Sequence, residues 1–219
     1  MSIVDVAFRL QGDVIPADHG YQLCSAIART VPGLHGDQGV GIAPVAGEPC
    51  GGRRLRLGPG SHLAFRLDAG RIAEVLPLAG QTLQVGGFPI LVGVPEVHSL
   101  EPAPSLYSRL VVIKGFMEPE PFLAAAQRQL EVLDTQGVAA LIPQPVIASM
   151  NAASPHGSRS PFLRRTLRIR DREIVGFALR VSGLSAEESI RLQEVGIGGR
   201  RRFGCGFFIP DRRGGDGQS

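Results

Sequence analysis

The sequence predicts an α+β protein built from two copies of one structural unit. In both halves of the 219-residue chain, short strand-like stretches alternate with two helix-like stretches in the same order. Pro102 and Pro104 interrupt the pattern between the halves. A chain of this length can form two domains of about 100 residues. We therefore expect domains over residues 1–103 and 104–210, followed by a disordered tail over residues 211–219.

The first half opens with a strand and a helix. Residues 2–10 alternate well enough between apolar and polar side chains to predict a strand. A helix begins at Asp18, a residue type that caps helices well, and Pro32-Gly33 ends it. Its apolar face repeats every fourth residue, at Leu23, Ile27 and Val31.

Further strands and a second helix complete the first half. Residues 40–45 and 61–69 favour strands, and residues 70–80 favour a short helix. Residues 81–100 favour two strands around Gly86-Gly87, because two adjacent glycines are a hairpin signal.

The second half begins in the same way. Residues 106–116 are rich in β-branched side chains and predict a strand. The next helix is opened by Pro119 and closed by Gly137. A short strand over residues 138–147 follows, and the polar stretch 149–160 favours a mobile loop.

A hairpin, a helix and a strand complete the second half. The hairpin spans residues 162–183 and turns near Asp171. The helix begins at Ser185, which can form a capping box with Glu188. The final strand covers residues 205–210.

Each half therefore has the order strand, helix, strand, strand, helix, strand, which is the ferredoxin-like unit. Two tandem ferredoxin-like, or RRM-like, domains would give two four-stranded antiparallel sheets with helices on one face. Because this fold carries many functions, the function must be argued from particular residues.

The composition excludes several classes of protein. It is 43% hydrophobic and 20% charged, as in ordinary soluble proteins. No apolar run approaches the roughly 20 residues that span a bilayer, and the first residues do not resemble a signal peptide. We expect a cytoplasmic protein without a membrane partner. The three cysteines lack the spacing of a disulfide framework or zinc site, so we expect no metal and no cofactor.

Positive charge is concentrated toward the C-terminus. From Arg159 onward the chain has 13 arginines against 7 acidic residues, whereas residues 1–158 have 10 basic against 13 acidic residues. This asymmetry favours a polyanionic partner at the C-terminal end. A solvated basic surface without a partner remains the alternative.

The stretch "GIGGRRRFGCG" at residues 196–206 resembles a phosphate-binding loop in composition. A helix precedes it and a strand follows, which is the reverse of a dinucleotide-binding fingerprint, and it has no P-loop lysine. Glycines permit close backbone approach to a phosphate. Arginines at 200, 201 and 202 could grip a nucleic-acid backbone. The alternative is a turn that only fixes sheet geometry.

Two Gly-apolar-Gly triplets five residues apart carry a family resemblance. They consist of Gly196 and Gly198 around Ile197, and Gly204 and Gly206 around Cys205, with Arg200, Arg201 and Arg202 between. This pattern resembles the C-terminal glycine-rich loop of the RAMP superfamily of CRISPR-associated proteins. The chain is most similar to the endoribonucleases of that superfamily that cut CRISPR precursor RNA within its repeats.

The resemblance implies metal-independent RNA cleavage, in which a ribose 2′-hydroxyl attacks the adjacent phosphate. The implied products are a 2′,3′-cyclic phosphate and a 5′-hydroxyl. The implied partners are CRISPR repeat RNA, as precursor and as processed crRNA, and possible subunits of a crRNA interference complex.

His35 is the candidate catalytic residue. Many of these nucleases carry their catalytic histidine in a Leu-His position just after the first helix, which Leu34 and His35 match. Pro32-Gly33 and Gly36 predict an exposed loop around it. Histidine suits proton transfer because its ordinary pKa lies near 6.5.

The other histidines are weaker candidates. His156, in the expected loop, is the rival because it could swing onto RNA. We interpret His19 as a surface or capping residue, and His62 and His98 as exposed residues at strand ends. Tyr21 is expected in the core.

The group that stabilises the phosphorane is left open. Some members of the family place a tyrosine and a lysine near the histidine, which the stretch around His35 lacks. Arg29 and Lys114 are the candidates here. Lys114 depends on its strand facing the cleft, and a solvent-exposed lysine is the alternative.

The hairpin predicts a second RNA contact through its arginines, with an ordinary exposed hairpin as the alternative. The basic residues concerned are Arg164, Arg165, Arg168 and Arg170.

Two other functions remain open. The first is a non-catalytic RAMP subunit that binds RNA in a crRNA effector complex and would not need His35. The second is an RRM-like binder of single-stranded RNA, for which the chain has few aromatic residues.

Overall fold

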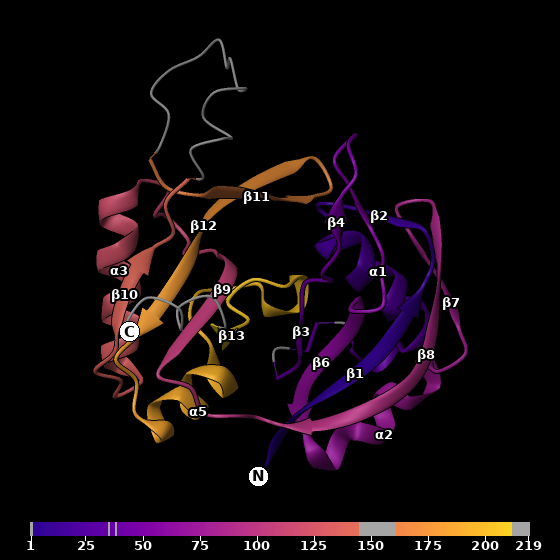
Figure 1. Cartoon of the computed structure of the whole chain (residues 1–219), viewed down its shortest axis with the longest axis horizontal. Helices are drawn as coiled ribbons and strands as arrows, with labels where there is room; N and C mark the ends of the chain where they lie inside the picture. Colours follow the sequence, from indigo (N-terminus) through magenta and orange to yellow (C-terminus); the bar gives the residue numbers. More distant parts are fainter. Residues whose placement is uncertain (1, 35, 38, 145–160, 212–219) are drawn as a thin grey trace. The chain divides into compact units, whose positions relative to one another are not determined.

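The computed structural model describes residues 2–34, 36–37, 39–144 and 161–211 (Figure 1). The candidate residues His35 and His156, the expected loop and all but the first residue of the expected tail lie outside these ranges.

The chain forms two compact units that do not simply follow the sequence. The first unit contains the residues up to Leu100 together with Leu167–Arg172 and Arg200–Phe207. The remaining residues form the second unit. Both added segments come from the second half of the sequence, and both carry arginines that the sequence assigned to RNA binding.

The first unit contains an antiparallel sheet with the order β3-β6-β1-β8-β7. Its strands are β1 (Ile3–Gln11), β3 (Gly41–Ile42), β6 (His62–Asp68), β7 (Thr82–Val85) and β8 (Phe88–Ser99). The first four strands of that order are the second, third, first and fourth strands of a ferredoxin-like unit, and β7 extends its edge.

The helices of the first unit follow the expected positions. Helix α1 spans Gly20–Thr30 and is followed by the 3-10 turn η1 (Pro32–Leu34). The second expected helix is only partly α-helical. Helix α2 (Ile72–Val75) lies between the 3-10 turns η2 (Ala69–Arg71) and η3 (Leu76–Leu78). Pro77 lacks the amide hydrogen that would continue an α-helix, which accounts for the change at η3.

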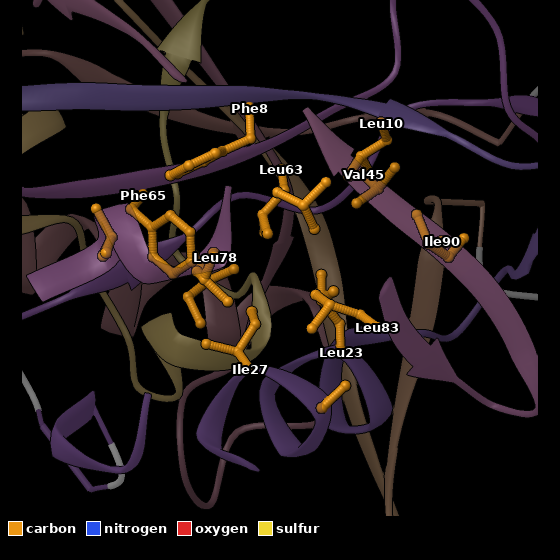
Figure 2. Packing of buried hydrophobic residues seen from close by; sticks show 14 of the residues in the cluster. Phe8, Leu10, Leu23, Ile27, Val45, Leu63, Phe65, Leu78, Leu83 and Ile90 are labelled. Carbon is orange, nitrogen blue, oxygen red and sulfur yellow. The ribbon is translucent and has the colours of Figure 1, made fainter. Parts of the chain in front are cut away.

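The core of this unit lies between the sheet and α1. Leu23 and Ile27 of α1 and Leu78 of η3 pack in one cluster with the inward side chains of the sheet. Figure 2 shows these side chains beside Leu63 and Phe65 of β6. Burial of each such side chain contributes about 1.5–3 kcal/mol. The core therefore fixes the position of α1 on the sheet.

A small second sheet adds to the first unit. It has the order β2-β5-β4, with β2 at Val14–Pro16, β4 at Glu48–Pro49 and β5 at Arg54–Arg56. Ile15 and Leu55 pair across it, and both are buried.

The second unit repeats the ferredoxin-like order as β10-β12-β9-β13, with β11 pairing on β12. The strands are β9 (Ser105–Val111), β10 (Val138–Leu141), β11 (Arg164–Ile169), β12 (Arg172–Ser182) and β13 (Ile209–Pro210), of which the end of β11 and the first residue of β12 fall in the first unit. Among the described residues of this unit, the helices are α3 (Pro119–Val132) and α5 (Ala186–Val195). The prediction of two tandem ferredoxin-like units is therefore confirmed.

Several local expectations were right and others were wrong. The capping box between Ser185 and Glu188 is present at the start of α5. The N-cap position of α1 is His19 and not Asp18, and the His19 side chain makes no capping hydrogen bond. Helix α3 ends at Val132, well before Gly137, and Asp134 follows in the left-handed region at φ 51°.

Candidate nucleic-acid interface

The glycines at the start of the glycine-rich loop, residues 196–206, are required by conformation and by close packing. Gly196 and Gly198 have φ values of 67° and 76°, in the left-handed region that side chains disfavour. A Cβ on Gly198 would lie 2.5 Å from the carbonyl oxygen of Val112. This part of the loop is thus held tightly against the end of β9.

Backbone amides of these glycines are used within the protein. The Gly198 N–H donates to Oε1 of Gln129 at 2.7 Å, and the Gly199 N–H donates to the carbonyl of Val112 at 2.9 Å. The amides of Gly196 and Gly204 donate to backbone carbonyls. Because these amides already donate within the protein, we no longer expect them to bind a phosphate. The arginine side chains are then the main candidates for RNA contact.

The segment Arg200–Phe207 of this loop belongs to the first unit. Arg200 has a left-handed φ of 70° and precedes the 3-10 turn η4 (Arg201–Phe203). Figure 1 shows this yellow segment beside β3. Gly204 allows the turn to approach Pro44, since a Cβ there would be 3.3 Å from the proline.

The three adjacent arginines are not equivalent. Arg200 is exposed, whereas Arg201 is drawn inward. Burial, followed by the nearby charge of Arg66, lowers the pKa of Arg201 to about 10, and Asp5 opposes this effect. Arg201 is still charged at neutral pH, but its guanidinium is partly buried and is therefore less accessible to RNA than that of Arg200.

Arg202 lies near the residue that follows the candidate histidine. A Cβ on Gly36 would be 3.8 Å from Nη1 of Arg202. The charge of Arg202 also opposes the rise that burial causes in the pKa of the Cys24 thiol on α1. Its guanidinium lies 4.9 Å from the ring centroid of Phe203. Arg202 thus connects the glycine-rich loop with α1 and with the segment after η1.

The tip of the hairpin, Leu167–Arg172, contacts the beginning of α1. The backbone N–H of Arg168 donates to Oδ2 of Asp18 at 2.7 Å. Nε of Arg170 donates to the hydroxyl of Tyr21 at 3.3 Å. The carboxylate of Asp18 therefore binds the hairpin.

The glycine-rich loop reaches the same end of α1. The rings of Tyr21 and Phe203 are 5.9 Å apart, and a Cβ on Gly20 would lie 2.3 Å from the carbonyl oxygen of Phe203. The expectation that Tyr21 is a core residue was wrong, because it is half-buried and contacts both segments. The structure thus brings two of the predicted RNA-binding elements together at the start of α1.

The four hairpin arginines divide between the units. Arg168 and Arg170 are exposed and belong to the first unit. Arg164 and Arg165 belong to the second unit, where Arg164 is exposed and Arg165 is half-buried.

The described histidines differ from the sequence interpretation at two positions, His19 and His62. His19 is 2% exposed. Its Nε2 accepts the Val45 N–H at 2.9 Å, and its Nδ1 lies 2.9 Å from the carbonyl oxygen of Pro16, to which it donates. This arrangement requires a neutral ring, so His19 is a buried structural residue and not a surface or capping residue. His98 is exposed and His62 is half-buried at the start of β6.

The two candidate phosphorane stabilisers lie in different units. Arg29 is exposed in the last turn of α1, where Nη2 donates to the carbonyl of Gln84 at 3.2 Å. Lys114 is exposed in a turn beyond the end of β9, in the second unit. It is therefore not on the strand that the sequence predicted to carry it.

An ion-pair network that the sequence did not reveal holds the segment after η1. Asp37 pairs with Arg71, whose Nε also donates to Glu74 at 2.9 Å. Asp37 further accepts the Gly39 N–H at 2.7 Å. Hydrogen bonding from Arg71 lowers the pKa of Asp37. The pair of Arg71 and Glu74 is local, but Asp37 lies 34 residues away and no sequence pattern connects them.

Among the described residues, no three histidine, cysteine or acidic side chains come together in a metal-binding group. No helix within the same ranges is long and apolar enough to cross a membrane. Cys205 is buried and the other two cysteines are half-buried, all as free thiols.

One family model and one curated protein match this chain over almost its whole length. The Cas6 family model, described as "Cas6 Crispr", matches residues 4–213. The CRISPR-associated endonuclease Cas6 of Myxococcus xanthus (strain DK1622) is 39% identical over 213 residues, which cover 97% of this chain and 84% of that protein.

Solved structures share the fold at low sequence identity. One, described as a Cas6-related protein from Pyrococcus furiosus, has a TM-score of 0.67 at 16% identity and covers 96% of this chain and 99% of its own. Another, described as a RAMP protein binding different RNA substrates, has a TM-score of 0.66 at 13% identity, with coverages of 95% and 99%.

Proposed function

This chain belongs to the Cas6 family of CRISPR-associated endonucleases, and we propose that it cuts CRISPR repeat RNA without a metal ion to give mature crRNA. It is an enzyme of the endoribonuclease class. The metal-independent mechanism, the roles of individual residues and the RNA substrate form the proposal.

The arrangement at the start of α1 is the observation that carries the proposal. The hairpin tip and the glycine-rich loop both pack there, through Asp18, Gly20 and Tyr21. This places the exposed guanidinium groups of Arg170 and Arg200 in the same unit. Phosphate contacts by arginine supply much of the affinity of a protein for RNA. The other arginines that we propose as RNA contacts are Arg164, Arg165, Arg168 and Arg202. For Arg201 and for Gly196, Gly198, Gly204 and Gly206 we propose that they shape the loop against which the RNA lies.

The reaction that we propose is a transesterification. The 2′-oxygen loses its proton and bonds to the adjacent phosphorus, while the bond from phosphorus to the 5′-oxygen breaks and that oxygen takes up a proton. No water and no metal ion enters this balance. We assign one of the two proton transfers to His35, since imidazole can act as acid or base near neutral pH.

The described neighbours of His35 support this assignment. Leu34 is 6% exposed and packs in the core of the first unit. Gly36 has a φ of 83°, and Asp37 is held by Arg71. The chain is thus fixed on both sides of the candidate residue. Preorganised positive charge stabilises a phosphorane most effectively, and Arg29 and Lys114 are the groups that we propose for this role.

One assay tests the mechanism. A labelled RNA carrying one CRISPR repeat from the source genome is incubated in EDTA with the wild-type protein, His35→Ala and the control His156→Ala. We expect the wild type and the control to cut at one position and leave a 2′,3′-cyclic phosphate, and His35→Ala to bind without cutting. Cleavage that needs Mg²⁺, or that survives His35→Ala, would contradict the mechanism.

The same assay distinguishes the second candidate, a non-catalytic RNA-binding subunit of a crRNA effector complex. In that case the wild type would bind the repeat tightly and leave it uncut. Co-purification with other subunits of such a complex would support membership, which we propose as compatible with either activity.

A further inference from the structure

A buried arginine lies on the face of the first sheet opposite the core. Along β6, Leu63 and Phe65 point into the core, so Arg66 points to the other face. Arg66 is nevertheless only 2% exposed. Burial of a charge requires compensation by a partner, and the partner here is Asp5, which pairs opposite Arg66 on β1.

The contact between Arg66 and Asp5 has the geometry of a strong pair. Nε of Arg66 lies 2.7 Å from Oδ1 of Asp5, and Nη2 lies 2.7 Å from Oδ2. Two parallel hydrogen bonds of this kind fix the plane of the guanidinium. Its orientation is therefore set by the sheet itself.

The glycine-rich loop covers this pair. The guanidinium carbon of Arg66 lies 4.1 Å from the centroid of the Phe207 ring. Gly41 of β3, which pairs with Arg66, provides the space, because a Cβ there would be 3.3 Å from Phe207 and 3.4 Å from Nη2 of Arg201. Phe207, at the end of the segment Arg200–Phe207, therefore stacks on the fixed guanidinium of Arg66, and the side chain of Arg201 lies beside Gly41.

We infer that Arg66 is a positioning residue for the glycine-rich loop: held flat by Asp5, it supports Phe207, and so sets where Arg200 and Arg202 of the same segment meet the RNA. This inference rests on the proposed RNA-binding function. It adds to the RNA-binding machinery a residue from the sheet face that is opposite the core. A lysine could keep the charge beside Asp5, but it cannot provide the flat surface on which Phe207 stacks.

The test compares Arg66→Lys, Phe207→Leu and the double variant. The probe is a CRISPR repeat RNA with 2′-O-methyl groups throughout, which lacks the attacking hydroxyl, and binding is measured in EDTA. Arg191→Lys is the matched control, because the hydrogen bonds of Arg191 go to Leu133 and Asp134 in the second unit.

We expect Arg66→Lys and Phe207→Leu each to weaken RNA binding about tenfold, which corresponds to about 1.4 kcal/mol, with thermal midpoints close to that of Arg191→Lys. The RNA affinity of the double variant should equal that of whichever single variant binds more weakly, because both substitutions remove the same contact between Arg66 and Phe207. Wild-type affinity in Arg66→Lys, or effects that multiply in the double variant, would overturn the inference.

Three further outcomes distinguish the positioning role from the proposed function. If Arg66→Lys does not fold, Phe207→Leu decides alone, since it keeps the ion pair and most of the apolar volume; unchanged RNA affinity in that variant overturns the inference. If the wild type binds the repeat no better than an unrelated RNA of equal length, the proposed function fails as well. If the wild type binds specifically and the variants match it, only the positioning role fails.

Discussion

Gly20, the first residue of α1, permits a close contact whose loss can be measured. A Cβ on this residue would lie 2.3 Å from the carbonyl oxygen of Phe203 and 3.2 Å from Cδ1 of Leu167. The first separation is far below van der Waals contact. In Gly20→Ala the glycine-rich loop, the helix or both must therefore move.

The expected destabilisation follows from two opposing effects. Overpacking of this kind costs about 1–3 kcal/mol. Alanine is more favourable than glycine inside a helix by about 0.8–1.0 kcal/mol, but Gly20 is at the end of the helix and gains only part of this. A net loss of about 1–2 kcal/mol corresponds to a decrease in Tm of roughly 2–8 °C for a chain of this size.

The assay is thermal unfolding followed by circular dichroism, with Gly33→Ala as control. A Cβ on Gly33 would have no heavy atom within 4 Å, so this variant should keep its Tm or gain slightly. Gly20→Ala should also bind repeat RNA more weakly, because the hairpin tip and the glycine-rich loop both contact this end of α1. Equal Tm values for the two variants would refute the reasoning.

Three further outcomes are expected. Asp37 has its pKa lowered from 3.8 by Arg71, so its contribution to stability is present above that pH and is lost as the pH falls through the lowered pKa. Asp37→Asn should accordingly have a lower free energy of unfolding than wild type at pH 6, and the difference between the two should shrink below about pH 4. A difference that stays the same at all pH values would contradict this. Gly198→Ala should lower Tm more than Gly20→Ala, since it combines a 2.5 Å approach to the Val112 carbonyl with a φ of 76°; a smaller decrease would be against it. Arg200→Ala should keep its Tm but weaken RNA binding and reduce the slope of log K against log salt by about 0.7–0.9, as expected for one lost phosphate contact; an unchanged slope would remove Arg200 from the interface.

The order of elements could be predicted because it depends on local patterns. The alternation along β1 and the four-residue repeat of Leu23 and Ile27 on α1 record which face is buried, whatever lies opposite. The capping box of Ser185 and Glu188 is likewise a contact between residues close in sequence. Such signals were sufficient for both ferredoxin-like units.

The errors concern contacts between distant residues. Asp18 has the right residue type to cap α1, but its carboxylate accepts the amide of Arg168 from the hairpin. His19 was interpreted as a surface residue because its partner Val45 lies on a distant part of the chain. Tyr21 was expected in the core, but its partners Arg170 and Phe203 lie on distant parts of the chain. In each case local sequence identifies the group but not its partner.

The glycine-rich loop was identified for the right reason and interpreted incompletely. The spacing of its glycines indicates an unusual backbone, which the left-handed φ values confirm. The sequence could not show that the amides of Gly198 and Gly199 donate to Gln129 and Val112 within the protein. It also could not show that Arg201 is partly buried while Arg200 is exposed.

The first unit includes two segments from the second half of the sequence, and this limits where the chain could be divided. A polypeptide that ended at the proline seam would lack Leu167–Arg172 and Arg200–Phe207, and would leave the Arg66 and Asp5 pair without its aromatic cover. The two ferredoxin-like units are thus not exchangeable modules. Recombination at the seam, or expression of the first half alone, would separate a sheet from the segments that complete it.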